Sequence, residues 1–384
     1  MTEPNPFFSP EREAFETAFR RFVATEVTPF VDDWDEAGEV PWDLHEKIGN
    51  FGVWGLGVDA EFGGLGMDDA FMRARFGEIL FGCGASGVAA AVGGRMISIA
   101  PLARFAPEPF KRDILPEIIA GRVNSALAIT EPSGGSDVAN LRTSGERVQG
   151  GWVLNGEKTY ITGGMTADWF VVGARTGKPG LGGISLFLVS KDADGFARTP
   201  LGQKMGWWCS DQATLHFDNC HVPDDALLGP QDKGFVAIMD NFNMERLAMM
   251  AGCVGMARRC YDAALDWSRE RQTFGQRLIE HQVIAHKFAD MSARIDSVAA
   301  YLDVICWKVN SGPMPIAEIS KGKVLSTKML EFVASECMQV FGGAAYMRGN
   351  PVERAWRELK VMAIGGGSEE IMRDLAARQM GLAG

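Results

Sequence analysis

The sequence of 384 residues lacks the patterns that mark several common classes of protein. Its seven cysteines contain no CxxC pair and its five histidines form no HExxH motif, so a structural zinc site is not expected. No window approaches about 18 consecutive apolar residues, and the first residues lack a charged start followed by an apolar run. We therefore expect neither a membrane span nor a secretion signal.

Positive charge is also in short supply. The chain has 38 Lys and Arg against 49 Asp and Glu, which gives a formal net charge of −11. This balance argues against nucleic acid or an anionic membrane surface as the main partner, although a local basic cluster could bind a small anion. The scattered cysteines are typical of unpaired, mostly buried thiols in a reducing compartment, so a cytoplasmic protein is expected.

The texture of the chain changes twice, and this predicts an α+β protein with three domains. Residues 1–123 read as a helical N-terminal domain. Residues 124–233 contain short β-branched and aromatic runs between turn residues, which predicts a small antiparallel β domain. Residues 234–384 read as long helices, which predicts a C-terminal helical bundle.

Local signals place several elements within these domains. Ser9-Pro10 predicts an N-cap followed by proline at the first helical position. Gly150-Gly151 and Asn155-Gly156 are two favoured hairpin turns. Residues 235–274 contain no proline and repeat apolar residues at helical spacing, so a long helix is expected that ends at Gly275. Further helices are expected over residues 282–311, 316–340 and 369–380.

Two motifs around the β region could hold a flat or anionic ligand. Leu127–Asp137 (LAITEPSGGSD) is rich in glycine and hydroxyl groups, so its backbone amides could approach a phosphate or a heterocycle closely. In Lys158–Gly164 (KTYITGG), Tyr160 and Thr162 share one strand face and could contact a ring. The alternatives are a plain surface loop and an ordinary cross-strand pair. Neither motif is a GxGxxG or Walker sequence.

Three further motifs lie in the helical C-terminal region. Arg271, shortly before Gly275, could grip a pyrophosphate with its planar fork, or could simply cap a helix. Gln339–Gly343 (QVFGG) is a second glycine-containing segment. Ile364–Arg373 (IGGGSEEIMR) puts a glycine turn directly before a helix that begins near Ser368, which suits an anion or a carbonyl oxygen, or is only a connecting loop.

Glu245 and Arg246 interrupt an apolar stretch of the long helix. Their neighbours on both sides are Phe and Met or Leu residues, and adjacent helical positions point about 100° apart. Both charges therefore cannot lie on one solvated face. A carboxylate in such surroundings is either a structural ion-pair partner or a functional group, and the residues alone leave both open.

Seven segments, taken in this order, resemble the acyl-CoA dehydrogenase family. This resemblance covers nearly the whole chain and implies a helical N-terminal domain, a middle β domain and a C-terminal four-helix bundle. It also implies FAD as cofactor, an acyl-CoA substrate and assembly as a homotetramer. The segments are AITEPSGGSD, LNGEKTYITGG, KMGWWCSDQATLHFDNCHVP, ERQTFGQRL, EHQVIAHKFADM, QVFGGAAYMR and IGGGSEEIMRD.

The resemblance also implies which residues contact the cofactor. Thr162 would donate toward flavin N5, and Tyr160 occupies a position where the family often has Trp. The residues expected around the flavin and upper pyrophosphate are Leu127, Ile129, Thr130, Gly135, Ser136, Tyr160, Ile161, Thr162, Ser368 and Glu370. The residues expected to hold the adenosine diphosphate part of a cofactor in the adjoining subunit are Arg271, Thr273, Phe274, His281, Gln282, Gln339, Val340, Gly342 and Gly343.

One departure from the family pattern concerns the catalytic base. Most members carry the catalytic glutamate in a loop that reads Ile-Tyr-Glu-Gly-Thr, whereas Gly366 occupies that place here and has no side chain. Isovaleryl-CoA and long-chain dehydrogenases instead carry the glutamate on the long helix just before an arginine. Glu245-Arg246 is similar to that arrangement, so Glu245 is the expected base. By similarity, Ser136, Asn243 and Arg246 would contact the substrate.

The implied reaction forms a trans-2-enoyl-CoA. Glu245 would remove the α-proton while the β-hydride passes to flavin N5, and the backbone N–H of Gly366 with a flavin ribityl hydroxyl would stabilise the thioester oxyanion. Electrons would leave to an electron-transfer flavoprotein. A branched, long or bulky acyl chain is favoured, because relatives with the base on the helix accept such groups. The alternatives are a flavin oxidase or monooxygenase of the same superfamily and a non-catalytic binding subunit.

Overall fold

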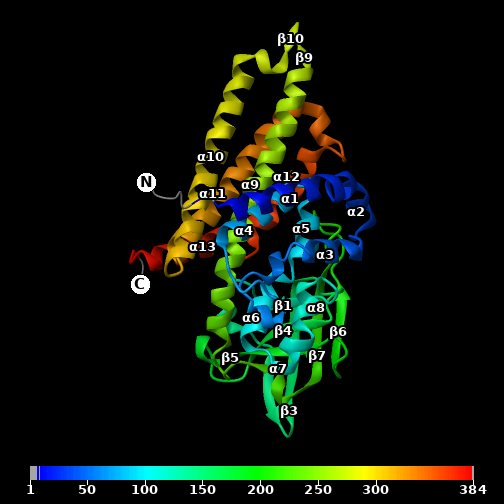
Figure 1. Cartoon of the computed structure of the whole chain (residues 1–384), viewed down its shortest axis with the longest axis vertical. Coiled ribbons are helices and arrows are strands. Elements are labelled where there is room, and N and C mark those ends of the chain that lie inside the picture. Colours follow the sequence, from blue (N-terminus) through cyan, green and yellow to red (C-terminus); the bar gives the residue numbers. More distant parts are fainter. Residues whose placement is uncertain (1–6, 8, 383–384) are drawn as a thin grey trace.

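The computed structural model describes residue 7 and residues 9–382 (Figure 1). The predicted domain bounds extend into residues 1–6, 8, 383 and 384, which lie outside the described residues, as does most of the N-terminal stretch used against a secretion signal. Along the long axis, the β sheet lies at one end and the β9–β10 hairpin at the other, with helices between them (Figure 1).

The N-terminal part is helical, as expected. The side-chain oxygen of Ser9 accepts a hydrogen bond from the backbone N–H of Arg12 at 3.3 Å, and Pro10 is the first helical residue, which confirms the predicted cap. The helices are α1 (Pro10–Glu26), α2 (Val31–Ala37), α3 (Trp42–Gly49), α4 (Ala70–Phe81), α5 (Ser86–Gly93), α6 (Met96–Phe105), α7 (Glu108–Asp113) and α8 (Leu115–Ile119), with short 3₁₀ helices at Thr28–Phe30, Val53–Gly55 and Ala60–Phe62.

The middle part is one eight-stranded sheet in the order β6-β7-β3-β2-β4-β5-β8, with β1 paired to β4. It differs from the expected antiparallel sheet because β1 runs parallel to β4, as does β2 at Ser144 and Arg175. The hairpin β2–β3 intervenes between β1 and β4, and such a crossover returns the chain in the same direction. The strands are β1 (Ser125–Ala128), β2 (Ser144–Val148), β3 (Gly151–Thr162), β4 (Trp169–Arg175), β5 (Ile184–Ser190), β6 (Phe196–Pro200), β7 (Gln212–Pro223) and β8 (Leu227–Leu228), with 3₁₀ helices at Val138–Asn140, Leu181–Gly183 and Asp224–Ala226.

Of the two predicted hairpin turns, one is correct. Gly150 (φ +81°) lies in the turn between β2 and β3. The other prediction is wrong, because Asn155 and Gly156 lie within β3, where the register with β7 shifts. A Cβ at Gly156 would lie 2.7 Å from the Cα of Thr143, so glycine allows a close approach of two backbone segments here and does not make a turn.

The C-terminal part consists of long helices, and α9 ends earlier than predicted. It stops at Glu270, and the chain then forms a small hairpin in which Thr273 pairs with Gln276. Phe274 (φ +51°) and Gly275 (φ +81°) are both left-handed, which makes the turn of this hairpin. The elements are α9 (Gly234–Glu270), β9 (Gln272–Thr273), β10 (Gln276–Arg277), α10 (Gln282–Ser311), α11 (Ile316–Phe341), α12 (Pro351–Ile364) and α13 (Glu369–Gln379), with 3₁₀ helices at Leu278–Glu280 and Gly342–Tyr346.

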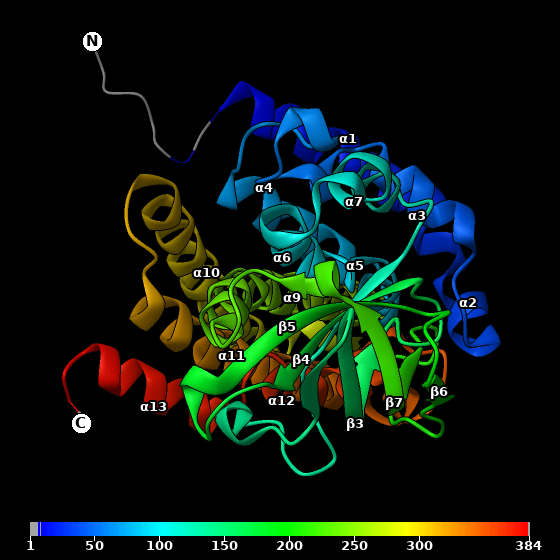
Figure 2. The same ribbon diagram turned by 90° about the horizontal axis from the view of Figure 1, so that it is seen from below.

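Helix α12 was not among the helices predicted from local signals. Its start was nevertheless visible, because the Asn350 side chain accepts from the backbone N–H of Val352 at 2.9 Å and Pro351 is the first helical residue. Helix α6 packs on β1, β4 and α9, and so joins the sheet to the helical bundle (Figure 2). All seven cysteines are buried with free thiols, as expected.

One stretch passes a simple test for a membrane-spanning helix. Residues Ser86–Phe105 are long and apolar enough by length and composition, with a mean hydropathy of 1.3. In the structure this stretch comprises two helices, α5 and α6, and 61% of its most apolar 18-residue segment is buried inside the fold. It also contains Arg95, whose buried guanidinium donates to the backbone oxygens of Ile118 and Val123. The cytoplasmic location stays a prediction.

Candidate active site

Glu245 lies on α9 with a carboxylate that is largely cut off from water. Among the described residues, its Oε2 atom is buried and has no hydrogen-bond partner. Burial raises the pKa of Glu245 to about 7, against the opposing pull of the Arg246 and Lys323 charges. A carboxyl group with this pKa can exchange a proton near neutral pH.

Gly366 lies directly against this carboxylate, in the loop between α12 and α13. Its φ of +63° favours glycine. A Cβ at position 366 would lie 3.7 Å from Glu245 Oε1 and 2.7 Å from the sulfur of Met249. A side chain at position 366 and the carboxylate at position 245 would therefore reach into the same space, which the structure gives to Glu245.

Two cations hold the backbone of this glycine loop. The Nε of Arg246 donates to the oxygen of Gly366 at 2.9 Å, and its NH1 donates to Asn243 Oδ1 at 3.2 Å. The Nζ of Lys323, on α11, donates to the oxygens of Gly365 at 2.9 Å and of Gly367 at 2.5 Å. Both Arg246 and Asn243 are buried, so Asn243 orients Arg246 behind the loop.

Lys323 is not among the residues predicted from the sequence, although it carries a recognisable signal. Lys323 continues the buried stripe of α11 formed by Ile319, Ser326 and Leu330, at helical spacings of four, three and four. A lysine at such a position is fully buried here, and a charge in an apolar stripe calls for a functional or structural explanation in the same way as Glu245.

The predicted flavin residues of the β region come together where the loop after β1 meets the C-terminal part of β3. The backbone N–H of Thr159 donates to the oxygen of Thr130 at 2.9 Å, which joins the loop after β1 to β3. At this point β3 bulges, and Tyr160 takes a left-handed φ of +59° with 70% of its surface exposed. Bulges and unusual φ values of this kind are frequent at binding sites, where they redirect a side chain.

The loop after β1 is exposed to solvent, whereas the residues that support it are buried. Residues 132–137, which include Gly135 and Ser136, are exposed. Leu127, Ile129 and Ile161 are buried, so they support the site from the core. These residues are therefore accessible to a ligand, and among their amides the backbone N–H of Gly134 already donates to the oxygen of Glu131 at 3.0 Å.

The segment between α5 and the start of α6 links the end of β3 to the helix that carries Glu245. A methyl group at Gly94, at the end of α5, would lie 3.2 Å from Thr162 Cγ2. The Asn241 side chain, one helical turn before Glu245, donates to the backbone oxygen of Ile97 in α6. The segment from Gly94 to Ile97 is thus in contact with both the end of β3 and α9.

Ser368 and Glu370 complete the surroundings of the glycine loop. Ser368 is the N-cap of α13, and its side chain accepts from the backbone N–H of Ile371 at 3.4 Å. Glu370 is exposed in the first turn of the same helix. Both residues follow Gly366 closely, as predicted from the glycine turn and the helix start.

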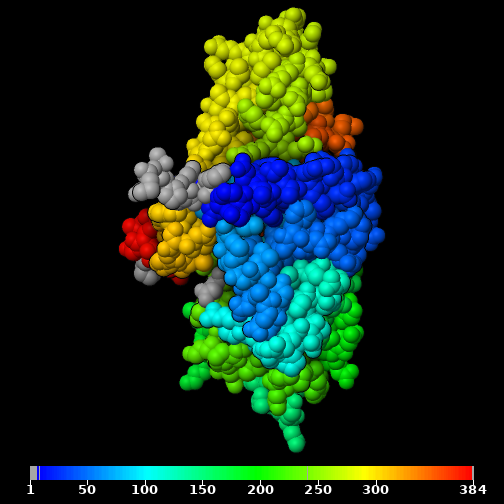
Figure 3. Space-filling model, in the orientation of Figure 1, coloured from blue at the N-terminus to red at the C-terminus, as the bar shows by residue number. Residues whose placement is uncertain are grey.

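The second group of predicted cofactor residues lies at the far end of α9. Arg271 follows Glu245 by 26 residues, which is about 39 Å at 1.5 Å per helical residue. Thr273 Oγ1 lies 2.9 Å from His281 Nε2, and Phe274 is fully exposed. This end of α9 and α10 projects from the rest of the molecule (Figure 3). One chain therefore does not bring the two groups of predicted residues together.

The segment Gln339–Gly343 belongs to this second group in space. The Phe341 ring stacks on Trp267 at a centroid distance of 5.3 Å, and the Arg271 guanidinium lies 5.8 Å from the same Trp267 ring. Gln339, Gly342 and Gly343 are exposed, whereas Val340 is buried. Arg271 and the QVFGG segment thus share one surface at the hairpin end.

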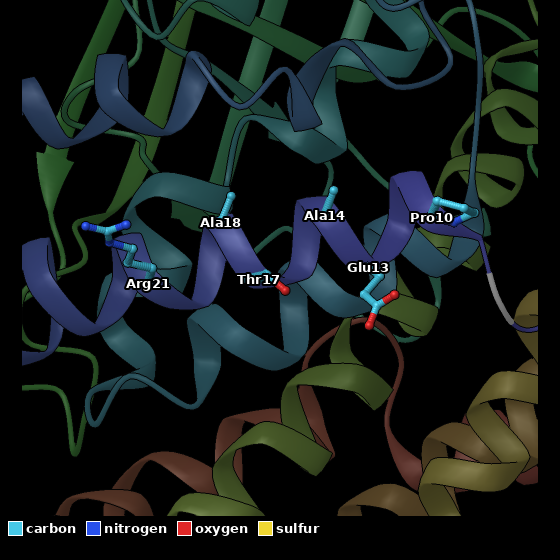
Figure 4. Close-up of a pocket in the computed structure, with 6 residues that line it drawn as sticks. All are labelled: Pro10, Glu13, Ala14, Thr17, Ala18 and Arg21. Atoms are coloured by element: carbon cyan, nitrogen blue, oxygen red, sulfur yellow. The ribbon is translucent and has the colours of Figure 1, made fainter.

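Other features of the described residues do not converge on a site. No group of three or more His, Cys, Asp or Glu side chains that could hold a metal ion occurs among them. An open hollow follows α1, and all of its lining side chains come from that single helix (Figure 4). The lining residues are Pro10, Glu13, Ala14, Thr17, Ala18 and Arg21.

Comparison with known families and proteins gives one consistent result. Three family models match the chain: the acyl-CoA dehydrogenase N-terminal domain over residues 9–122, the middle domain over residues 126–220 and the C-terminal domain over residues 232–381. The chain is 31% identical over 377 residues to the long-chain specific acyl-CoA dehydrogenase, mitochondrial, of Rattus norvegicus, covering 97% of this chain and 87% of that protein. It is 31% identical over 376 residues to the isovaleryl-CoA dehydrogenase, mitochondrial, of Solanum tuberosum, covering 97% and 91%.

Solved structures agree with the family models. A probable acyl-CoA dehydrogenase from Mycobacterium abscessus superposes with a TM-score of 0.93 at 37% identity, covering 97% of this chain and 100% of that chain. A glutaryl-CoA dehydrogenase from Mycobacterium smegmatis in complex with FADH2 superposes with a TM-score of 0.90 at 26% identity, covering 98% and 96%.

Proposed function

Because the chain belongs to the acyl-CoA dehydrogenase family, we propose that it oxidises an acyl-CoA thioester to a trans-2-enoyl-CoA with Glu245 as the catalytic base. The observation that carries this proposal is the Glu245 carboxylate, which has a buried, unpartnered oxygen and reaches the space that a side chain at position 366 would fill. The alternative role as a structural ion-pair partner finds no support in this geometry, because the neighbouring Arg246 bonds to Gly366 and Asn243 instead.

FAD is the cofactor of this family, and the chain is a flavoprotein of it. The region where the loop after β1 meets β3 fits a flavin, because it combines an exposed loop with a bulge that leaves Tyr160 exposed. Thr130, Gly135, Ser136 and Thr162 would hold the flavin with Tyr160. When bound, FAD supplies the acceptor for the β-hydride.

The residues of the chain prepare the substrate for this transfer. An α-proton of a thioester is a weak acid until the carbonyl oxygen is stabilised as it gains negative charge. The backbone N–H of Gly366 would donate to that oxygen, and an amide already held in place supplies this stabilisation without reorganisation. Glu245 would then remove the α-proton, and its raised pKa matches proton transfer near neutral pH.

A complete cofactor site requires more than one copy of the chain in this proposal. Arg271 lies about 39 Å along α9 from Glu245, and the hairpin with Phe274, His281 and the segment with Gly343 are packed at the same end of the helix. They would contact the adenosine diphosphate part of FAD in an adjoining subunit of a homotetramer. We further propose that an electron-transfer flavoprotein or a similar acceptor reoxidises the flavin.

The first experiment is an anaerobic titration of the purified protein with a panel of acyl-CoAs, in which the visible flavin absorbance is followed. Bleaching by one class of thioester establishes dehydrogenation and names the acyl chain. A flavin that stays oxidised with every thioester would overturn the proposal in favour of an oxygen-using relative of the superfamily. Purified protein that neither contains nor takes up FAD would instead indicate a binding subunit.

The base is tested by Glu245→Gln, with Asp266→Asn as a matched change on an exposed part of the same helix. We expect Glu245→Gln to keep bound FAD and to lose dehydrogenation by at least about 10²-fold, because a general base contributes at least that much. Asp266→Asn should keep the wild-type rate. Full activity of Glu245→Gln would exclude Glu245 as the base.

The preferred acyl chain is the last part of the proposal. A branched, long or bulky chain is favoured, since two similar proteins are a long-chain and an isovaleryl-CoA dehydrogenase. The same panel tests this preference through kcat/KM for butyryl-CoA, isovaleryl-CoA and a long-chain acyl-CoA. Equal values on all three would remove it.

A further inference from the structure

We propose that Lys323 is a positioning residue that orients and polarises the backbone N–H of Gly366 toward the thioester carbonyl. This inference rests on the proposed function and adds a residue that no sequence motif identified. Lys323 projects from α11 and is fully buried, and its Nζ donates to the backbone oxygens of Gly365, Gly367 and Ala363 at 2.9, 2.5 and 3.5 Å.

The direction of the Gly366 N–H follows from the bond to Gly365. In a trans peptide the C=O of one residue and the N–H of the next point in opposite directions, and no cis peptide occurs among the described residues. Since the C=O of Gly365 points to Lys323 on α11, the N–H of Gly366 points to the opposite side of the loop.

The glycine loop has no side chains of its own that could restrict its backbone. Residues 365–367 are three consecutive glycines, and Gly366 and Gly367 both have positive φ values, +63° and +104°. Glycine loses the most conformational freedom on ordering. Lys323 holds the first and third carbonyls of this triplet, and Arg246 holds the second at 2.9 Å. Two buried cations thus fix three successive peptide units.

The charge of Lys323 also acts on the donor strength of the N–H. A cation that accepts electron density from a C=O makes the N–H of the same peptide a better donor, because successive hydrogen bonds polarise one another. The peptide between Gly365 and Gly366 lies between the ammonium on one side and the expected oxyanion on the other. The positive charge of Lys323 would therefore reach the thioester oxygen through one peptide unit.

The charges around Lys323 are consistent with this role. Glu245 faces Arg246 on its own helix and Lys323 on α11. Lys323 also faces the Cys253 thiol on α9 and Glu369 on α13.

Glu369 is not a dedicated counter-ion of Lys323, because it has other partners. Its Oε1 accepts from the Thr327 hydroxyl at 2.8 Å, and its Oε2 lies 3.0 Å from Lys328 and 3.2 Å from Arg373. The hydrogen bonds of the Lys323 ammonium are directed to the backbone of the glycine loop.

The test compares Lys323→Met with Lys321→Met, a change of the same kind two residues away on α11. Lys323→Gln is a second variant that keeps a donor without the charge. For each holoenzyme, FAD content and thermal unfolding establish that the fold is retained. The probe is the trans-2-enoyl-CoA product of the best wild-type substrate, labelled with ¹³C at the thioester carbon, and the measurement is its carbonyl stretching frequency when bound.

In the wild type the bound carbonyl should absorb at a lower frequency than in water, and in Lys323→Met this shift should be reduced. We expect kcat to fall about tenfold or more while KM changes by less than about threefold, because weakening an oxyanion donor acts mainly on the transition state. The apparent pKa of the base in the pH profile of kcat/KM should rise, since the Lys323 cation lowers the pKa of Glu245. Lys323→Gln should be intermediate.

An unchanged carbonyl frequency and pH profile in a folded, FAD-containing Lys323→Met would overturn the inference, even if the rate fell. So would an equal effect of Lys321→Met. Failure of the proposed function has a different signature, because the wild type itself would then bleach with no acyl-CoA. If Lys323→Met does not fold, the same frequency and pH measurements on Lys323→Gln decide the question.

Discussion

Two carboxylates that are desolvated in the folded protein, Glu131 and Glu245, have opposite pKa shifts. Glu131, in the loop after β1, accepts from Lys158 Nζ at 2.8 Å and from the backbone N–H groups of Arg142 and Thr143 at 2.6 and 2.8 Å. Glu245, on α9, has an oxygen with no partner among the described residues. Both groups are desolvated, but the ionised form of Glu131 is stabilised by more hydrogen bonds than that of Glu245.

The pKa values follow from this difference. Burial alone would raise the pKa of Glu131, but Lys158 and the backbone amides outweigh it and hold the pKa at about 2. Burial raises the pKa of Glu245 to about 7, because Arg246 and Lys323 only partly compensate it. Glu131, with its hydrogen bonds made, is thus a structural tie that holds the loop after β1, whereas Glu245, with an oxygen left unpartnered, is available for proton transfer.

The largest expected effect comes from breaking the structural tie. Lys158→Met leaves the Glu131 charge buried without its partner, so we expect a loss of about 3–5 kcal/mol in unfolding free energy, with loss of FAD from the loop it supports. The double variant Glu131→Gln/Lys158→Met should recover part of this loss. Denaturant midpoints and flavin content of the purified holoenzymes measure both effects.

A matched control is Lys191→Met, which removes a lysine from an exposed ion pair with Asp168 at 2.8 Å. Exposed pairs contribute only about 0–1 kcal/mol. Equal destabilisation by Lys158→Met and Lys191→Met would contradict the assignment of the Glu131–Lys158 pair as the tie of this loop.

The second effect concerns the unfolding free energy that the protein loses when the Glu245 carboxyl ionises. Its folded pKa of about 7 lies above the ordinary value of 4.5, so the folded state binds more protons and loses stability as pH rises between these two values. Glu245→Gln removes this loss. We compare the unfolding free energy of the variant with that of the wild type at pH 5 and at pH 8. The variant's advantage should be larger at pH 8 than at pH 5, by at most about 3 kcal/mol.

Thermal unfolding of both proteins at the two pH values measures this gain. Any constant effect of the amide group is present at both pH values and cancels in the comparison. A difference between variant and wild type that does not change with pH would show that the Glu245 carboxyl does not titrate in this range.

The smallest expected effect comes from moving the base. We expect Glu245→Gly to lose its activity, and adding Gly366→Glu places a carboxylate where the two positions share space. We expect a recovery of about tenfold, or about 1.4 kcal/mol in the barrier. Recovery stays incomplete because a side chain at a φ of +63° is strained and meets the sulfur of Met249.

The matched control for this prediction is Glu245→Gly/Gly366→Gln, which has the same size and shape at position 366 but cannot take a proton. Initial rates of flavin reduction by the best acyl-CoA compare the two double variants. Equal rates would mean that the recovery, if any, does not come from a relocated base.

Local signals predicted the long C-terminal helices and several caps and turns, because such signals are short-range. The Ser9-Pro10 cap, the turn at Gly150 and the helix start at Ser368 each depend on a few neighbouring residues. The same reasoning failed at Gly156 and Gly275. At Gly156 a hairpin turn was predicted, but the glycine permits a close approach to the backbone of Thr143. At Gly275 a helix end was predicted, but the glycine forms a left-handed turn beside Phe274.

The candidate site was only partly predictable for the same reason. Glu245 stood out because a charge interrupts an apolar stretch. Lys323 carries a similar signal on α11, but its partners are backbone oxygens of residues 363–367, which lie 40 or more residues away in the chain. Bonds to backbone atoms leave no pattern of residue types in the sequence.

The order of helical and β regions and the family follow from the sequence alone, which also predicted most of the residues proposed here to carry the chemistry. Hydrophobic periodicity, caps and collinear motifs are all encoded along the chain. Three features appear only in the folded structure: Glu245 Oε2 has no hydrogen-bond partner among the described residues, Gly366 leaves room for the carboxylate, and Lys323 and Arg246 hold the glycine loop. The physical reason is that desolvation and hydrogen-bond geometry depend on which distant elements pack together.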